Sequence, residues 1–274
     1  DHRDLHSFPT RRSSDLSGDD IAFDTETSSL EIYAPDFEVR LAQLGTSEVA
    51  FVWEPADFPE LVRIAATTRQ VWYWNADFDT RVIDHAFGVT LEDTAPFVQD
   101  AAILARLIDS RGKKDGGVGH GLKEQAEELL GLEVADARKK VMEAAKKYKI
   151  RSEAEAWKRI PTDDETYVKY AGQDVMLTAR LGRLYREGIQ RFNQEEQAAL
   201  AHAVAYCIST MNRRGLRLDR PYAEEALSKF QAEFDANEAK LAAFGIEPTK
   251  TGNYSTSRAG LIAKFEALGG PFTE

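Results

Sequence analysis

The stretch from Asp19 to Leu30, DDIAFDTETSSL, decides the fold, because a short apolar run, residues 21–23, leads directly into a polar tip. Such a run is typical of a buried strand that presents polar side chains at its end. Asp24 and Glu26 are two residues apart at this end, so their carboxylates project from one face of the strand and can share a hard cation. One pair at this spacing does not by itself identify a metal site.

The segments that follow alternate between strand-like and helix-like patterns. Two β-rich runs, residues 38–45 and 48–53, are separated by turn-like residues and predict a hairpin. The next elements are expected to be a helix, a strand, a helix ending at a glycine, a strand and a helix, at residues 61–69, 71–74, 78–88, 97–99 and 100–110. This order predicts an α/β fold in which a mixed β-sheet has helices packed on its faces.

Residues from about 120 onward have mainly helical patterns. The longest predicted helix begins after Pro161, where Thr162 and Glu165 have the spacing of a capping box. Tyr170 and Asp174 are four residues apart on this helix, which places them on one face, a turn from each other. Because Asp174 adjoins apolar positions, its carboxylate is expected to need a cation or hydrogen-bond donors.

A further candidate carboxylate lies between the strand at 71–74 and the next helix. Asn75 and Asp79 span this junction, near the carboxyl end of the strand, where open α/β sheets collect functional side chains. Asp77 is also close, and Asp79 is preferred because Phe78 and the apolar positions after it fix the phase of the helix. Helix capping or a surface position would explain each polar pair taken singly, so their identification depends on the combination.

Together, the polar segments form an ordered set. FDTET at 23–27, NADFD at 75–79 and YAGQD at 170–174 resemble the motifs of the DEDD exonucleases of ribonuclease H-like fold. The last motif is similar to that of the tyrosine subclass, because the histidine subclass would need a histidine at position 169, where this chain has lysine. Residues 19–190 resemble the proofreading domain of family A DNA polymerases, especially phage versions.

The resemblance implies a ribonuclease H-like mixed β-sheet flanked by helices, and a 3′-5′ exonuclease that hydrolyses single-stranded DNA 3′ ends with two divalent cations, Mg²⁺ or Mn²⁺. It implies that Asp24 bridges both cations and that Glu26 and Asp174 complete the shell of the first. Asp79 would hold the second cation partly through water, and Tyr170 would orient the attacking water. Two cations in such a site activate the water and stabilise the charge on the phosphate and the leaving oxygen.

The distribution of charge along the chain affects whether nucleic acid is expected as a partner. The formal net charge of −11 argues against broad contact with phosphate, but a metal site is itself acidic and a frayed 3′ end needs few contacts. Segment 138–151 carries seven basic residues against one acidic residue, and is interpreted either as a solvated helix face or as a surface that tracks the phosphate backbone. The candidate nucleic-acid-binding residues are Asn75, Lys139, Lys140, Lys146 and Lys147. Trp72 and Trp74 alternate along a strand, which favours core packing over base stacking.

The chain is expected to contain three segments. Residues 1–16 match, codon for codon, a one-frame translation of a widely used sequencing-adapter oligonucleotide and are interpreted as non-native. Residues 17–190 would form the exonuclease domain. Residues 191–274 resemble the start of a polymerase domain, a mostly helical partial thumb. The palm and fingers are missing, so we expect no polymerase activity from this chain and expect the rest of the polymerase as its partner.

Composition narrows the cellular setting. Hydrophobic residues make up 43% of the 274 residues, enough for at least one core. No apolar run approaches the roughly 20 residues that span a bilayer, so no membrane partner is expected. The single cysteine, Cys207, excludes an intrachain disulfide and a multi-cysteine zinc site, and is expected to be buried as a small hydrophobe. The predicted location is the cytoplasm of a bacterium or a phage-infected cell.

Two other functions stay open on the sequence alone. One is a free-standing RNA-processing exonuclease of the same superfamily, against which the thumb-like tail argues. The other is a nucleic-acid-binding module that has lost catalysis, against which the complete set of carboxylates argues. Release of nucleotides from labelled DNA and RNA would separate these functions from proofreading.

Overall fold

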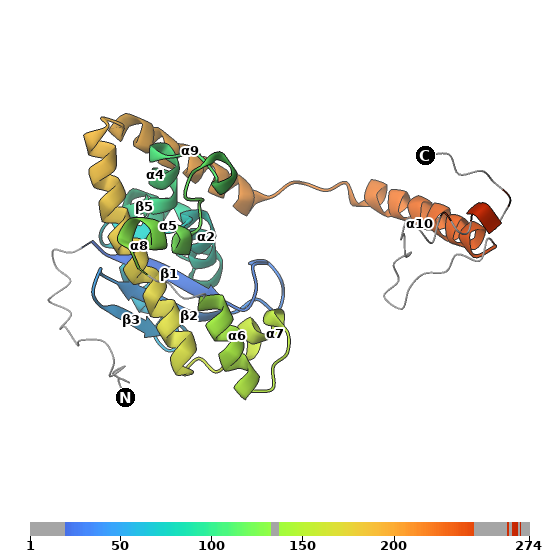
Figure 1. The fold of residues 1–274 in the computed structure, drawn as a ribbon, viewed down its shortest axis with the longest axis horizontal. Coiled ribbons are helices and arrows are strands. Elements are labelled where there is room, and N and C mark those ends of the chain that lie inside the picture. Colours follow the sequence, from blue (N-terminus) through green and yellow to red (C-terminus); the bar gives the residue numbers. More distant parts are fainter. Residues whose placement is uncertain (1–19, 133–136, 244–261, 263–264, 268, 270–274) are drawn as a thin grey trace. The chain divides into compact units, whose positions relative to one another are not determined.

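The computed structural model of the chain describes residues 20–132 and 137–243, together with 262, 265–267 and 269. The chain divides into two compact units between Gly215 and Leu216. The first unit contains the β-sheet and the helices around it, and the second contains α10 (Arg220–Ala243) (Figure 1). The candidate functional residues lie in the first unit.

Five strands form one mixed sheet: β1 (Ala22–Thr27), β2 (Val39–Gly45), β3 (Ala50–Trp53), β4 (Val71–Tyr73) and β5 (Val98–Asp100). Their order across the sheet is β3-β2-β1-β4-β5 (Figure 1). β2 pairs antiparallel with both β1 and β3, whereas β4 pairs parallel with both β1 and β5. The predicted mixed sheet and the predicted hairpin are therefore confirmed.

Nine helices of the described part of the first unit surround this sheet: α1 (Pro59–Thr67), α2 (Ala76–Phe87), α3 (Leu91–Thr94), α4 (Ala101–Ile108), α5 (Leu122–Leu130), α6 (Ala137–Lys147), α7 (Glu153–Arg159), α8 (Glu165–Arg191) and α9 (Glu195–Arg214). The predicted helices at 61–69 and 78–88 are confirmed as α1 and α2, each of which begins two residues earlier than predicted. At α1 the reason is Pro59, whose fixed φ suits the first helical position.

Alternation along the strands assigns their side chains to two faces of the sheet. Trp72 and Trp74 pack in an apolar cluster with α4, α5 and α8, which confirms their predicted place in the core. Phe23 and Tyr73 belong instead to a cluster with α1 and α2. The indole ring of Trp72 lies so close to Gly182 of α8 that a Cβ at this glycine would overlap it. α8 therefore packs closely across one face of the sheet.

The start of α8 differs from the prediction. Asp164 is the N-cap, and its side chain accepts hydrogen bonds from the backbone N–H groups of Thr166 and Tyr167. The hydroxyl of Thr162 donates instead to Glu54. The predicted capping box is wrong, because the segment contains several good capping residues and tertiary contacts decide among them.

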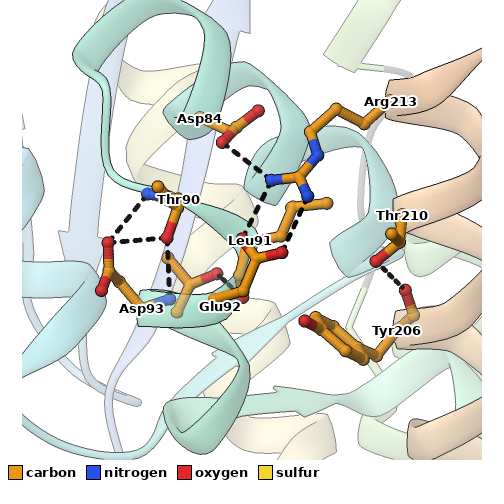
Figure 2. Close-up of polar contacts among 9 residues, drawn as sticks. Asp84, Thr90, Leu91, Glu92, Asp93, Tyr206, Thr210 and Arg213 are labelled. Atoms are coloured by element: carbon orange, nitrogen blue, oxygen red, sulfur yellow. Dashed lines mark hydrogen bonds and ion pairs between the residues drawn. The ribbon is translucent and has the colours of Figure 1, made fainter.

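α9 packs on α2, α3, α4 and α8. Figure 2 shows Arg213 at its end reaching both Asp84 on α2 and Glu92 on α3, with a distance of 2.8 Å from Nη2 to Glu92. Ala198 and Ser209 lie on the buried face of α9, whereas Cys207 is exposed. The expectation that Cys207 is buried is therefore wrong, because the apolar stretch around it continues past the face that α9 buries.

The predicted non-native segment 1–16 and most of residues 244–274, the end of the predicted partial thumb, lie outside the described residues. The boundary expected between residues 190 and 191 stays a prediction, although α9, which follows it, packs within the first unit. Of the helices in the described part of the chain, none combines the length and the apolar character of a membrane span.

Candidate active site

β1 and α8 bring three carboxylates together, and β1 continues to Thr27 rather than ending before Asp24 as expected, because Asp24 and Glu26 pair with β2. Asp24 and Glu26 alternate with Thr25 on β1, so they share the face of the sheet on which α8 lies. Asp174 lies on α8, and one oxygen from each of these three carboxylates lies within 4.8 Å of the other two. Glu26 and Asp174 are each only 8% exposed. Three acidic groups so close and so poorly hydrated require a positively charged partner.

Asp79 joins this site from α2. Its Oδ1 accepts hydrogen bonds from the backbone N–H of Thr25 at 2.9 Å and from the Thr25 hydroxyl at 2.6 Å. Asp79 is 3% exposed and close enough to Asp24 for the two charges to interact. Asp77 pairs instead with Arg81 at 2.7 Å. The structure therefore places Asp79, rather than Asp77, beside Asp24.

The crowding of these groups changes their acidity. Burial raises the pKa of Glu26 well above its ordinary value, and the charge of Asp24 adds to the effect. Burial and the charge of Asp24 likewise raise the pKa of Asp79. Burial also raises the pKa of Asp24, although a hydrogen bond from Gln43 opposes this. Carboxylates in such a site repel one another unless a cation joins them, and donor atoms that are all oxygen fit a hard divalent cation.

Lys123, on α5, was not expected at this site. Its ammonium group forms an ion pair with the Asp174 carboxylate, and the charges of Asp24 and Glu26 also attract it. Burial lowers the pKa of Lys123 to about 8 despite these carboxylates. Nothing in the pattern LKEQAEELL distinguishes this lysine from one on the surface of an amphipathic helix, because its place depends on how α5 packs against α8.

Gln43, on β2, is a second residue that the motifs do not reveal. It is fully buried directly opposite Asp24 in the β1-β2 register. Its Nε2 donates hydrogen bonds to Asp24 Oδ2 at 2.8 Å and to Glu26 Oε1 at 3.4 Å. A signal for it does exist, because a lone glutamine inside the strand VRLAQLG indicates a polar partner on the same face of the sheet.

Tyr170 and Asn75, the two other predicted site residues of the motifs, lie on different elements. Tyr170 lies on α8 one turn before the last carboxylate, with its ring centroid 5.8 Å from that of Trp157 and 5.0 Å from Lys123 Nζ. Asn75 is exposed just before α2 in a left-handed conformation with φ 68°, and its backbone N–H donates to Asp100. The roles expected of these two side chains stay predictions.

The lysines predicted to contact nucleic acid are exposed on α6: Lys139, Lys140, Lys146 and Lys147. The opposite face of α6 buries Val141, Ala144 and Ala145 in a cluster with Tyr167 and Ala171 of α8. The basic segment is therefore an exposed helix face next to the half of α8 that carries Tyr170. This arrangement is compatible with both interpretations of the segment.

Glu26→Gln is expected to stabilise the cation-free protein, and the gain should grow as the pH rises above 4.5, the ordinary pKa of a glutamate. A carboxyl whose pKa is raised by folding contributes stability below its unfolded pKa and loses it as the pH rises through the folded pKa. Glutamine imitates the protonated form and does not titrate. Urea unfolding of both proteins in EDTA across the acidic and neutral range measures the difference, and a gap independent of pH would contradict the expectation.

A mixed sheet crossed by a long helix, with acidic side chains on its central strand, is the architecture of ribonuclease H-like exonucleases. NrnC of Brucella melitensis bound to pGG has this fold, with a TM-score of 0.55 and 23% sequence identity over 72% of this chain and 86% of that one. The chain belongs to the 3′-5′ exonuclease family, which it matches over residues 10–185.

Two phage proteins narrow the kind of exonuclease. The chain is 31% identical to the DNA polymerase of Mycobacterium phage D29 over 92% of its own length and 42% of the phage protein. It is 33% identical to that of Mycobacterium phage L5 over 83% of its own length and 39% of the phage protein. The chain thus spans about two fifths of these relatives, and the resemblance to the exonuclease domain of phage family A DNA polymerases is confirmed.

Proposed function

We propose that this chain is a metal-dependent 3′-5′ exonuclease that removes nucleotides from single-stranded DNA 3′ ends, as the proofreading part of a phage DNA polymerase. The observation that carries the proposal is the convergence of Asp24, Glu26, Asp79 and Asp174, from three separate segments of sequence, around the end of β1. Similarity to mycobacteriophage DNA polymerases supports the proofreading context. The protein would act in the cytoplasm of the infected cell, joined to the rest of the polymerase chain.

The proposed cofactor is a pair of Mg²⁺ or Mn²⁺ ions. The four carboxylates supply oxygen donors, which these ions prefer. NrnC, which shares the fold with a TM-score of 0.51, also has a structure with bound Mg²⁺. Bound in this site, two such ions would supply an activated water and neutralise the charge that develops on the phosphate and on the leaving 3′ oxygen.

The proposed roles of the carboxylates come from the resemblance to the DEDD exonucleases, and their neighbours support these roles. Asp24 lies close to Glu26 and Asp174 and also interacts with Asp79, which supports a role for it at both ions. Glu26 and Asp174 would complete the ligands of the first ion. Asp79 would hold the second partly through water, with its Oδ1 fixed by Thr25. Gln43, hydrogen-bonded to Asp24, would keep that carboxylate oriented.

The proposed substrate contacts surround these carboxylates. Tyr170 would orient the attacking water with its hydroxyl, since it lies one helical turn from Asp174. Asn75 would help position the nucleotide at the start of α2. The lysines of α6 would track the phosphates of the strand leading to the 3′ end, because exposed ammonium groups on one helix face attract a polyanion.

Replacing Lys139, Lys140, Lys146 and Lys147 by alanine is expected to weaken single-stranded DNA binding and to flatten its salt dependence. For every phosphate that one of these lysines neutralises, the slope of log K against log salt concentration should become shallower by about 0.7. Alanine favours the helix and the buried face of α6 stays unchanged, so stability should change little. Fluorescence anisotropy in EDTA, which prevents hydrolysis, measures the binding.

The matched control for these lysines removes positive charge from the opposite side of the sheet. Arg63 lies on α1 and Arg69 follows it, and α1 packs with α2 on the face away from α6. The double alanine variant of these arginines should leave the salt slope unchanged. If the slope of log K against log salt concentration is unchanged in the lysine variant, the basic face of α6 is a solvated helix face and does not bind phosphate.

The experiment that tests the proposed function is release of nucleotides from 3′-labelled single-stranded DNA and RNA of one sequence, with Mg²⁺, Mn²⁺ or EDTA. We expect release from DNA with either ion and none in EDTA. Release mainly from RNA would instead identify an RNA-processing exonuclease. Binding without release under any condition would identify a nucleic-acid-binding module and overturn the proposal.

A further inference from the structure

Lys123 reaches the carboxylates from α5, with its side chain partly buried and 27% exposed. Its ammonium nitrogen and Oδ1 of Asp174, with which it forms an ion pair, are both shielded from solvent. The same nitrogen lies 5.0 Å from the centre of the Tyr170 ring, and the charges of Asp24 and Glu26 attract it. Lys123 therefore contacts the groups to which the proposed function assigns the first cation.

A lysine at this place and a divalent cation need the same carboxylate. A cation held by Asp24, Glu26 and Asp174 would use the Asp174 oxygens that now pair with the ammonium group. The Lys123 ammonium group and a divalent cation at the same carboxylate would repel each other strongly, because little water screens their charges there. Without the cation, however, the carboxylates need a positive charge to offset their burial and mutual repulsion.

We propose that Lys123 is an internal counter-ion, which holds the carboxylates together in the cation-free protein and is displaced when a divalent cation binds. This inference rests on the proposed function, because it takes these carboxylates to be the cation site. By linkage, Lys123 stabilises the cation-free fold and weakens cation binding. It therefore sets the cation concentration at which the site becomes occupied.

Replacement of Lys123 tests this inference with Mn²⁺ alone, without nucleic acid. In Lys123→Met, which keeps the length of the side chain and removes its charge, we expect the Kd for Mn²⁺ measured by calorimetry to fall about tenfold. The Tm in EDTA should fall, and the rise in Tm on adding Mn²⁺ should exceed that of the unaltered protein. We expect the same changes in Kd and Tm for Lys123→Gln, which keeps a hydrogen-bond donor. This second variant tests the inference if Lys123→Met does not fold.

Lys113→Met is the matched control. Lys113 is largely exposed and forms an ion pair at 2.7 Å with Glu124, which lies near the start of α5. Its replacement therefore removes one positive charge without changing the carboxylate cluster. The control should bind Mn²⁺ as the unaltered protein does. An equal gain in affinity from Lys113→Met, or unchanged or weaker Mn²⁺ binding by both Lys123 variants, would overturn the inference.

The Mn²⁺-binding experiment on Lys123 and the nuclease assay can fail independently of each other. If the unaltered protein binds Mn²⁺ but releases no nucleotides, the exonuclease proposal fails, and tighter Mn²⁺ binding by the Lys123 variants still supports the counter-ion. If the unaltered protein binds no Mn²⁺ by calorimetry, the counter-ion inference fails regardless of the nuclease assay.

Discussion

Asp24→Asn is expected to lower the rate of nucleotide release by about a thousandfold or more, which corresponds to about 4 kcal/mol less transition-state stabilisation. Asp24 lies close to all three other carboxylates, and its own Oδ2 accepts a hydrogen bond from Gln43. Removal of its charge therefore disturbs both proposed cation positions. Single-turnover release from 3′-labelled DNA at saturating Mg²⁺ measures the effect without interference from product release.

The fold should survive this change, which makes the loss of activity interpretable. Asparagine has nearly the shape of aspartate, and burial disfavours the charge that is removed. We therefore expect the Tm of Asp24→Asn in EDTA to equal or exceed that of the unaltered protein. Its calorimetric heat of Mn²⁺ binding should be strongly reduced.

Asp77→Asn is the matched control for Asp24. Asp77 is in the same sequence motif as Asp79, but its carboxylate pairs with Arg81 and accepts a hydrogen bond from Asn212. Activity within about threefold of the unaltered protein is expected, because an ion pair of this partly exposed kind contributes little. If Asp24→Asn keeps more than a tenth of the activity, or if Asp77→Asn loses as much as Asp24→Asn does, the assignment of the carboxylates is wrong.

The sequence predicts the positions of the carboxylates well because local periodicity controls them. Alternation along β1 sends Asp24 and Glu26 to one face, and the helical repeat of α8 puts Tyr170 one turn from Asp174. The phase of α2 correctly favours Asp79 over Asp77 as the neighbour of Asp24. These placements need only the type of each element, which the apolar pattern supplies.

Residues whose position depends on tertiary packing are not predicted. Lys123 enters the site only because α5 packs against α8, and Gln43 meets Asp24 only in the register that β1 and β2 adopt. The N-cap of α8 is ambiguous for the same reason, since Thr162 and Asp164 are both good capping residues and a contact with Glu54 engages Thr162. Distant contacts, which no short pattern records, determine these three details.

Asp100 is a buried carboxylate that binds the starts of two helices. At the end of β5 it caps α4, with Oδ1 2.9 Å from the backbone nitrogen of Ala102. The same carboxylate accepts hydrogen bonds from the backbone N–H groups of Asn75 at 3.1 Å and Ala76 at 2.9 Å, where α2 begins. This contact ties α2, which carries Asp79, to the sheet, and the early start of α2 follows from it.

Asp100→Ala is therefore expected to lower the free energy of unfolding by about 4 kcal/mol, since several buried N–H groups at two helix starts lose their acceptor. Asp93→Ala is the control, because among the described residues the exposed carboxylate of Asp93 accepts hydrogen bonds only from Thr90 at the start of the short α3 (Figure 2), and about 1 kcal/mol is expected there. Urea unfolding measures the free energy of unfolding of both variants.

Activity below the unfolding transition should also fall in Asp100→Ala, because α2 can then shift Asp79 away from Thr25. Asp93→Ala should keep full activity. Equal losses of stability in the two variants would show that the double cap contributes no more than an ordinary one.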